Sequence, residues 1–226
     1  MKLLIVSATE AEIMPLLDHL DSSWAKAENK SYAKNGDVIE ICITGVGMLA
    51  TAYALTKVLL FMKHDLALQV GICGAFDKQL KLGELVYISS EQLGDIGAED
   101  HENYIDIFEM GLLGKYVFPF INAELVAPRL SIPSINKLIA VSSLSVNSVS
   151  GNEASIKRRI EKFDCEVESM EGAAFHYVCL NENVSFAQVR SISNYVEPRD
   201  KSKWKMKEAI IALNKWLIEF VEMKMI

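Results

Sequence analysis

Four long apolar segments constrain the fold of this chain more than any other feature. They are residues 2–8 (KLLIVSA), 66–76 (LALQVGICGAF), 138–145 (LIAVSSLS) and 185–194 (SFAQVRSISN). Segments that carry so few charged side chains are typical of strands in a sheet that helices cover on both faces. With 226 residues, the chain is long enough to bury such a sheet in a full core.

The segments between these strands have helical patterns. The expected helices are residues 10–20, 47–62, 153–163, 170–181 and 201–224. Asn35-Gly36 predicts a two-residue hairpin turn, which makes the sheet mixed because its flanking strands run antiparallel. Residues 94–135, with scattered Gly and Pro, are expected to be irregular. We therefore expect a three-layer αβα sandwich with a central mixed, twisted β-sheet, formed by residues 1–226 as one domain.

Charge and composition exclude several classes of function. The net charge of −7 argues against nucleic acid or an anionic membrane as the main partner. Apolar runs such as residues 58–62 are too short to span a bilayer, and the N-terminal segment lacks the apolar core of a signal peptide, so we expect a cytoplasmic protein. The four cysteines form no CxxC and the four histidines show no metal-ligand spacing. We expect neither a metal nor a cofactor.

Catalytic residues are expected at the carboxyl ends of the strands, where α/β sheets bind ligands. Glu12 follows the first strand. Both Glu10 and Glu12 also suit the N-terminus of a helix, where negative charge is stabilising. The alternative is that one of them acts as a base at the end of the strand.

Residues 44–50, TGVGMLA, match the GxGxxA pattern of dinucleotide-binding turns. The match is weak, because the pattern follows a hairpin and Asp65 precedes its strand instead of ending it. Gly45 and Gly47 therefore predict a tight turn. Such a turn permits close helix packing or lets backbone approach a sugar or an attacking water.

Two further polar residues lie beside expected strand ends. Glu171 begins a helix, where it suits the helix dipole and can also accept two hydrogen bonds from a ribose diol. Asn194 ends a buried strand. Cleavage of an N-glycosidic bond requires a water-activating carboxylate, negative charge near a cationic ribose and a hydrogen bond to the departing base. Glu12, Glu171 and Asn194 supply such a set.

Five motifs carry a family resemblance. SATEAE, TGVG, GICGAF, ESMEGAA and VRSISN occur in the order and spacing of the purine nucleoside phosphorylase and nucleosidase superfamily, which the chain resembles over nearly its whole length. It looks closest to the nucleosidase branch, which holds methylthioadenosine/S-adenosylhomocysteine nucleosidase and futalosine hydrolase. The runs SVNSVSGN and SNYVEPRD are similar to the futalosine hydrolase branch, which serves menaquinone biosynthesis.

The resemblance implies a role for each matched residue. It makes Glu12 the carboxylate that positions the nucleophilic water, and it makes Asn194 the contact to N7 of the purine. The residues that it assigns to substrate binding are Met170 and Glu171 at the ribose, Arg190 in support from the same strand as Asn194, Gly45 and Gly47 near the sugar, and Ile72, where adenine-specific nucleosidases carry serine.

Two features narrow the reaction. Phosphorylases of this superfamily bind phosphate with arginines from early loops, and this chain has no arginine before Arg129, so water is the expected nucleophile. Asn194 replaces the aspartate of the adenine-specific branch; its amide can accept from N7–H and donate to O6. The expected substrate is thus a 6-oxopurine nucleoside such as futalosine. The alternatives are methylthioadenosine/S-adenosylhomocysteine nucleosidase, a purine nucleoside phosphorylase and a non-catalytic nucleoside-binding protein.

Three details of the expected site stay open. No aromatic residue occurs at 153–155, where the adenine-specific branch has a base-stacking phenylalanine; Phe76 and Tyr195 are candidates for that contact. Futalosine carries an aryl carboxylate on its 5′ side, for which Arg129 and Arg199 are candidate partners. The resemblance also implies a homodimer in which residues 97–108 complete the neighbour's site, although this acidic loop suits plain solvent exposure equally well.

Overall fold

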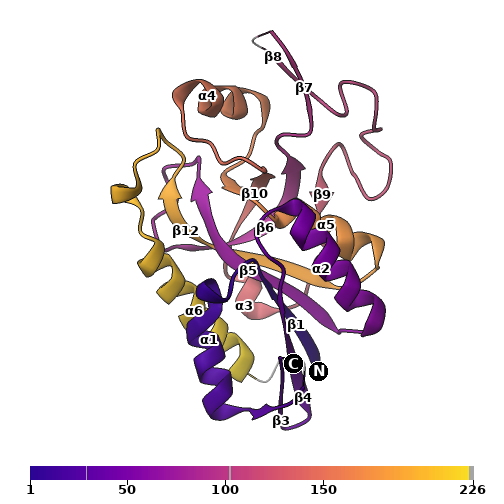
Figure 1. Cartoon of the computed structure of the whole chain (residues 1–226), viewed down its shortest axis with the longest axis vertical. Coiled ribbons are helices and arrows are strands. Elements are labelled where there is room, and N and C mark those ends of the chain that lie inside the picture. The colour runs from indigo at the N-terminus through magenta and orange to yellow at the C-terminus, as the bar shows by residue number, and fades with distance from the viewer. Residues whose placement is uncertain (29, 102, 224–226) are drawn as a thin grey trace.

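A mixed sheet organises the computed structural model, which describes residues 1–226 except 29, 102 and 224–226. The elements are β1 (Lys2–Ser7), α1 (Glu10–Ser23), β2 (Ala25–Lys26), β3 (Ser31–Lys34), β4 (Asp37–Ile43), α2 (Met48–Phe61), β5 (Leu66–Ala75), β6 (Leu85–Leu93), β7 (Gly97–Asp100), β8 (Asn103–Asp106), β9 (Leu125–Val126), α3 (Pro133–Asn136), β10 (Ile139–Ser145), α4 (Glu153–Lys162), β11 (Val167–Ser169), α5 (Gly172–Asn181), β12 (Phe186–Tyr195) and α6 (Met206–Glu222). Figure 1 shows how they are arranged.

The sheet has the strand order β11-β10-β6-β12-β5-β1-β4-β3-β2, with β9 beside β6. Strands β12, β5, β1 and β4 run parallel to one another, whereas β6 is antiparallel to β12. Strand β3 returns antiparallel to β4 through the predicted Asn35-Gly36 turn. At the other end, β11 pairs with β10 and also, antiparallel, with β5. The sheet therefore curls back on itself around β5 and β12.

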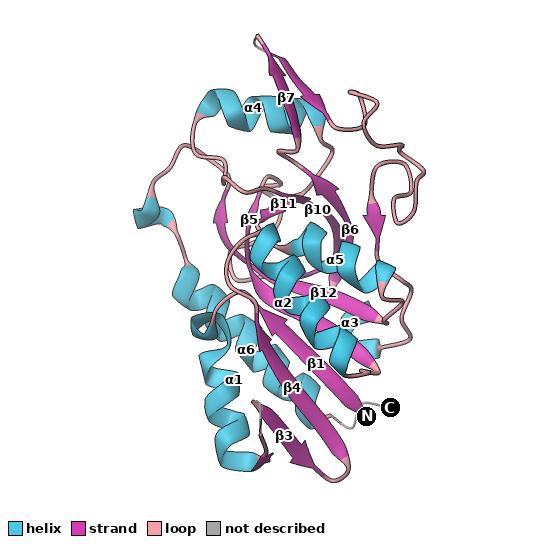
Figure 2. Cartoon of the chain, turned by 45° about the vertical axis from the view of Figure 1, so that its right-hand side comes forward, coloured by secondary structure: helices cyan, strands magenta, loops and turns pink. Residues whose placement is uncertain are grey.

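Helices cover both faces of the sheet, as the apolar strands predict (Figure 2). On one face, α1 and α6 pack on a cluster that includes Leu3, Leu68 and Leu213. On the other, α2 and α5 pack on a cluster that includes Leu4 and Phe175. The alternation of Leu3 and Leu4 between the two clusters follows from the two-residue period of a strand. The predicted mixed αβα architecture is confirmed.

The structure differs from the sequence prediction in two segments. Residues 94–135 contain the β7–β8 hairpin, β9 and the short α3, where we expected irregular backbone. The last helix begins at Met206, not at Lys201, because Lys201–Lys203 form a separate 3-10 turn after the Asp200 cap. Its expected end at residue 224 lies outside the described residues.

The β7–β8 hairpin projects from the body of the molecule beside α4 (Figure 1). Its base is tied to α4 of the same chain, because Lys162 donates to the Tyr104 carbonyl at 2.9 Å and pairs with Asp106 at 3.3 Å. None of the helices in the described part of the chain is long and apolar enough to cross a membrane.

Candidate active site

The candidate site lies over the carboxyl-terminal part of β5, at residues Gly71-Ile72-Cys73-Gly74. Arg190 of β12 lies opposite Gly71 in the parallel register. A Cβ atom on Gly71 would lie 2.6 Å from Nη1 of Arg190 and 2.8 Å from Oε1 of Glu12. A side chain at position 71 would therefore displace one of these charged groups. The glycine lets side chains from two distant segments meet above the same point of the sheet.

Glu12 lies in the first turn of α1 and combines a capping role with a place in the site. Its Oε2 accepts hydrogen bonds from the backbone N–H of Thr9 at 3.1 Å and from the Thr9 hydroxyl at 2.9 Å, as in a capping box. Its Oε1 accepts from the N–H of Ile72 at 3.2 Å. Glu10 is exposed and pairs with Lys30 instead. Of the two glutamates, only Glu12 reaches the end of β5.

Glu171 and Arg190 form a buried ion pair. Glu171 precedes α5, and its Oε2 lies 3.5 Å from both Nη1 and Nη2 of Arg190. The two side chains are 7% and 2% exposed. Arg190 also donates to the carbonyl of Ile72 at 3.4 Å. The carboxyl groups of Glu12 and Glu171 thus lie near one guanidinium over Gly71, and negative groups in such a place suit a developing cation.

The turn at residues 44–47 binds the Glu171 carboxylate through a backbone hydrogen bond. Gly45 and Gly47 have φ values of 85° and 95°, which favour glycine. Gly47 stands at the N-terminus of α2, and its N–H donates to Oε1 of Glu171 at 3.1 Å. The prediction of a tight turn is thus met, and the turn contributes a fixed hydrogen bond to the candidate ribose-binding carboxylate.

A β-bulge aims Asn194 away from the regular strand. The register of β12 with β5 shifts between Ile192 and Asn194, so Ser193 is the extra residue. The Ser193 hydroxyl lies 2.8 Å from Oδ1 of Asn194 and 3.0 Å from the carbonyl of Cys73. Nδ2 of Asn194 donates to the Tyr195 carbonyl at 3.0 Å. The half-buried amide keeps one free N–H and one acceptor position for a ligand.

The remaining predicted residues are neighbours in sequence of the residues described above. Met170 is half-buried beside Glu171. Ile72 acts through its backbone, whose N–H and carbonyl contact Glu12 and Arg190. Of the two candidates for stacking on a base, Phe76 packs with the cluster of Leu144, and the Tyr195 hydroxyl donates to the Leu80 carbonyl at 3.0 Å.

Sequence reasoning missed two residues that organise this site, Gly71 and Ser193. A glycine inside an apolar strand often marks a close approach, so the run QVGIC held a usable signal for Gly71. No comparable signal marks the bulge at Ser193. Among the described residues, no group of three or more His, Cys, Asp or Glu side chains is placed to hold a metal ion.

The chain belongs to the phosphorylase superfamily, whose family model matches residues 2–222. It is 29% identical over 176 residues to the futalosine hydrolase of Thermus thermophilus, an alignment that covers 75% of each chain. Two solved structures share the fold. The methylthioadenosine/S-adenosylhomocysteine nucleosidase of Colwellia psychrerythraea in complex with adenine has a TM-score of 0.79 at 18% identity and covers 98% of this chain and 94% of that one. Futalosine hydrolase of Helicobacter pylori has a TM-score of 0.78 at 17% identity, with 98% and 97% covered.

The buried ion pair generates a stability prediction. Replacing Arg190 with Met should lower the free energy of unfolding by about 3–5 kcal/mol, because the Glu171 charge is then buried without its partner. Adding Glu171→Gln should recover part of that loss. Urea unfolding measures both variants, with Arg158→Met, which removes an exposed arginine, as the control. Strictly additive effects of Arg190→Met and Glu171→Gln would contradict the pairing.

Proposed function

We propose that the chain hydrolyses the N-glycosidic bond of a 6-oxopurine nucleoside, and that its substrate is futalosine, which would yield hypoxanthine and dehypoxanthine futalosine. The family membership and the similarity to the futalosine hydrolase of Thermus thermophilus support this reaction class. The observation that carries the choice of base is the Asn194 amide, held at the bulge of β12 next to the strand end that also holds Glu12 and Arg190.

The proposed reaction uses each charged group of the site. Glu12 holds a water and takes a proton from it as the water oxygen bonds to C1′ of the ribose. Glu171 accepts hydrogen bonds from the ribose hydroxyls, and its negative charge stabilises the oxocarbenium-like transition state. The C1′–N9 bond breaks and its electron pair leaves with the base, which takes up a proton from solvent at N7. Glu12 then releases the proton of the attacking water to solvent and returns to its carboxylate form. The net change is the addition of one water across the bond.

The geometry of Asn194 favours an oxopurine. The Ser193 hydroxyl and the Tyr195 carbonyl orient the amide, which leaves Oδ1 to accept from N7–H and Nδ2 to donate to O6. An adenine would present its amino group to the Nδ2 donor instead. Such a mismatched buried polar pair costs about 1–3 kcal/mol. For this reason, methylthioadenosine/S-adenosylhomocysteine nucleosidase activity is the second candidate function.

The nucleophile is proposed to be water, not phosphate. A phosphate site needs cationic side chains that are free to bind it in bidentate fashion. In the candidate site the guanidinium is that of Arg190, which is engaged with Glu171 and Ile72 and is almost fully buried. No arginine precedes Arg129 in the sequence, so the early segments supply no guanidinium to a phosphate.

Of the two candidate partners for the aryl carboxylate of futalosine, we favour Arg199. Its backbone N–H donates to Gly151 at 3.1 Å, and its guanidinium lies 5.2 Å from the ring centroid of Trp204. The backbone N–H of the next residue, Lys205, donates to the Ser193 carbonyl at 2.7 Å. Residues 199–205 therefore lie over the end of β12 beside Asn194. A guanidinium stacked on an indole offers both a charge and an aromatic surface to an aryl carboxylate.

Arg129 is in a less suitable place for that role. It follows Pro128, whose carbonyl accepts from the Tyr87 hydroxyl, and Tyr87 pairs with Val189 of β12. Val189 precedes Asn194 by five residues along the strand. These contacts put Arg129 near Tyr87 of β6, which pairs with the middle of β12 and not with the end that carries Asn194.

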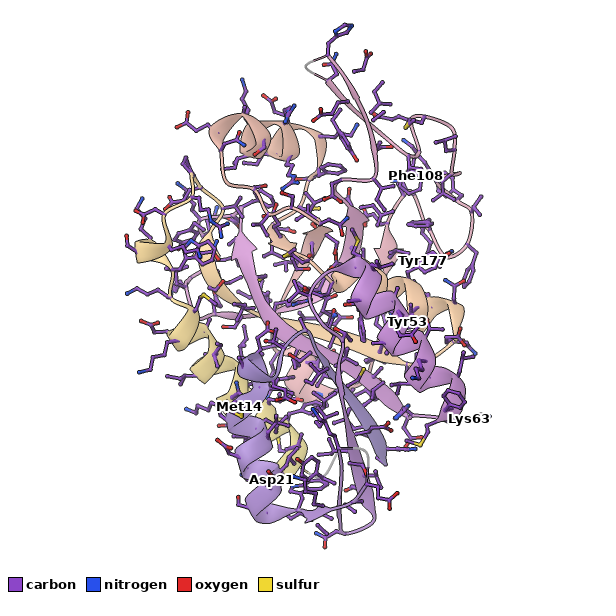
Figure 3. All side chains as sticks on the ribbon, viewed as in Figure 1. Met14, Asp21, Tyr53, Lys63, Phe108 and Tyr177 are labelled. Atoms are coloured by element: carbon purple, nitrogen blue, oxygen red, sulfur yellow. The ribbon has the colours of Figure 1, made fainter. Side chains whose placement is uncertain are left out.

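We also propose that the chain forms a homodimer through an apolar face over α2 and α5. Figure 3 places Tyr53 of α2, Tyr177 of α5 and Phe108 along one side of the molecule. The exposed apolar residues of these two helices include Leu49, Tyr53, Leu60, Phe61 and Tyr177. Phe120, whose ring packs against Tyr177, follows a loop in which Tyr116, Val117 and Phe118 are also exposed. Apolar exposure on this scale is typical of an interaction surface. Light scattering should report twice the mass of one chain; a monomer at micromolar concentration would contradict this proposal.

A base-release assay tests the proposed function. The protein is incubated with futalosine, inosine, methylthioadenosine and S-adenosylhomocysteine, with and without phosphate, and free base is quantified. Hypoxanthine released from futalosine without phosphate supports the proposal. Phosphate-dependent release would make the protein a phosphorylase, preferred release of adenine would make it an aminopurine nucleosidase, and release from none would favour a binding protein.

Glu12→Gln should abolish turnover but leave nucleoside binding largely intact, because the amide cannot take the proton of the attacking water. We expect kcat to fall by a factor of ~10² or more. Single-turnover kinetics and calorimetric binding separate the two effects. Glu10→Gln, two residues away and directed to Lys30, is the matched control and should keep full activity. Equal turnover in the Glu12 variant would remove the assigned base.

Asn194→Asp should lose activity on hypoxanthine nucleosides disproportionately, because a carboxylate cannot donate a hydrogen bond to O6. The ratio of kcat/KM for futalosine to that for methylthioadenosine measures the effect and should fall by a factor of ~5–100. Asn181→Asp places the same charge change at the exposed end of α5 as a control. An unchanged ratio would contradict base recognition by Asn194.

Arg199→Met should raise KM for futalosine more than for inosine, which lacks the aryl carboxylate. We expect a factor of ~10 for futalosine, within the range for loss of a hydrogen-bonded charge, and little change for inosine. Arg129→Met serves as the paired comparison. A larger effect from Arg129 than from Arg199 would reverse our assignment.

A further inference from the structure

Glu91 is a fully buried carboxyl group that the proposed reaction does not use. It lies on β6 and is 0% exposed. Burial raises the pKa of Glu91 to about 7, against the opposing effects of Ser145, Arg190 and Gln188. Burying a carboxyl group in this way is costly, and an apolar side chain would fill the same space at lower cost. The contacts of Glu91 indicate what the carboxyl group does there.

These contacts lead from β6 to the first turn of α5. The Ser145 hydroxyl donates to Oε2 of Glu91 at 2.8 Å, and Gln188 donates to Oε1 at 3.0 Å. The same Ser145 oxygen accepts the backbone N–H of Ala173 at 2.7 Å. Glu91 thus fixes the direction of the serine hydroxyl so that its oxygen lone pairs face the helix.

The backbone N–H of Ala173 needs this acceptor because α5 has no capping side chain at its N-cap position. The first N–H groups of a helix have no partner within it, and a side chain at the N-cap position normally accepts one of them. Glu171 stands at that position but makes no capping hydrogen bond. Its carboxylate faces Gly47 and Arg190 instead. Ser145, oriented by Glu91, supplies the acceptor that Glu171 does not.

The first turn of α5 also packs directly on Glu91. A Cβ atom on Gly172 would lie 1.7 Å from Oε1 of Glu91 and 2.6 Å from Nε2 of Gln188. Only glycine fits at this position, so the backbone of the first turn lies directly against the buried carboxyl group. This contact lies next to Glu171 in the chain.

We propose that Glu91 is a positioning residue: with Ser145 it caps α5 from a neighbouring strand and so leaves the Glu171 carboxylate free for the ribose. The capping link follows from the contacts alone, whereas its effect on catalysis rests on the proposed function. The two parts are tested separately.

Hydrogen exchange tests the capping link in the absence of any substrate. Ser145→Ala should increase the exchange of the Ala173 amide by a factor of ten or more, while peptides from α6 stay protected. Ser142→Ala is the matched control, because this hydroxyl lies on the same strand but bonds to Glu166. Unchanged protection of the Ala173 amide in Ser145→Ala would overturn the link, whatever the protein's activity.

Kinetics test the effect on Glu171. In Ser145→Ala, KM for the nucleoside should rise about tenfold, while Kd for free hypoxanthine, which has no ribose, should stay within twofold. A variant that is merely less stable would shift neither constant selectively. Equal changes in KM and Kd, or no change in either, would overturn the positioning role. A wild-type protein that releases no base would overturn the proposed function and leave the exchange result standing.

Glu91→Gln provides the conservative rescue. Its amide oxygen can still accept from Gln188, and its NH₂ group can donate to Ser145, whose oxygen has two lone pairs. We expect this variant to keep Ala173 protection and nucleoside KM near those of the wild type, in contrast to Glu91→Ala. If Glu91→Ala behaves like the wild type in both measurements, Glu91 has no positioning role.

Discussion

The site depends on the burial of the Arg190 guanidinium above Gly71. Arg190 lies within the sheet, 2% exposed, and reaches both the carbonyl of Ile72 and the carboxylate of Glu171. A charge in such a place is tolerated only when it is paired. Glu171 is therefore held at the start of α5, and the approach of Glu12 over the same glycine completes a group of three charges. The fold brings β1, β5, β11 and β12 together at this point.

Much of this arrangement could be predicted from the sequence. The apolar strands indicated a covered sheet, and the Asn35-Gly36 turn indicated that it is mixed. The polar residues at expected strand ends, Glu12, Glu171 and Asn194, do belong to segments that lie around the carboxyl end of β5 and the start of α5. These predictions rest on local patterns, which a single sequence displays directly.

What could not be predicted depends on contacts between distant segments. The sequence of the short β11 gives no sign that it pairs with both β10 and β5, and these pairings bring the segment before Glu171 to the sheet. The bulge at Ser193 arises from the pairing of β12 with β5, and its hydroxyl orients the Asn194 amide. In the sequence, Glu91 is one polar residue in a strand. Its role is indicated by contacts with distant segments: the hydrogen bonds from Ser145 and Gln188 and the packing of Gly172 against it.

The central claim is that Asn194 reads an oxopurine at the end of β12. A crystal structure of the protein with hypoxanthine bound tests this claim most directly. We expect O6 within hydrogen-bond distance of Nδ2 of Asn194 and N7 within hydrogen-bond distance of Oδ1, at ~2.7–3.2 Å. A base bound elsewhere, or bound at β12 with neither atom facing the Asn194 amide, would contradict it.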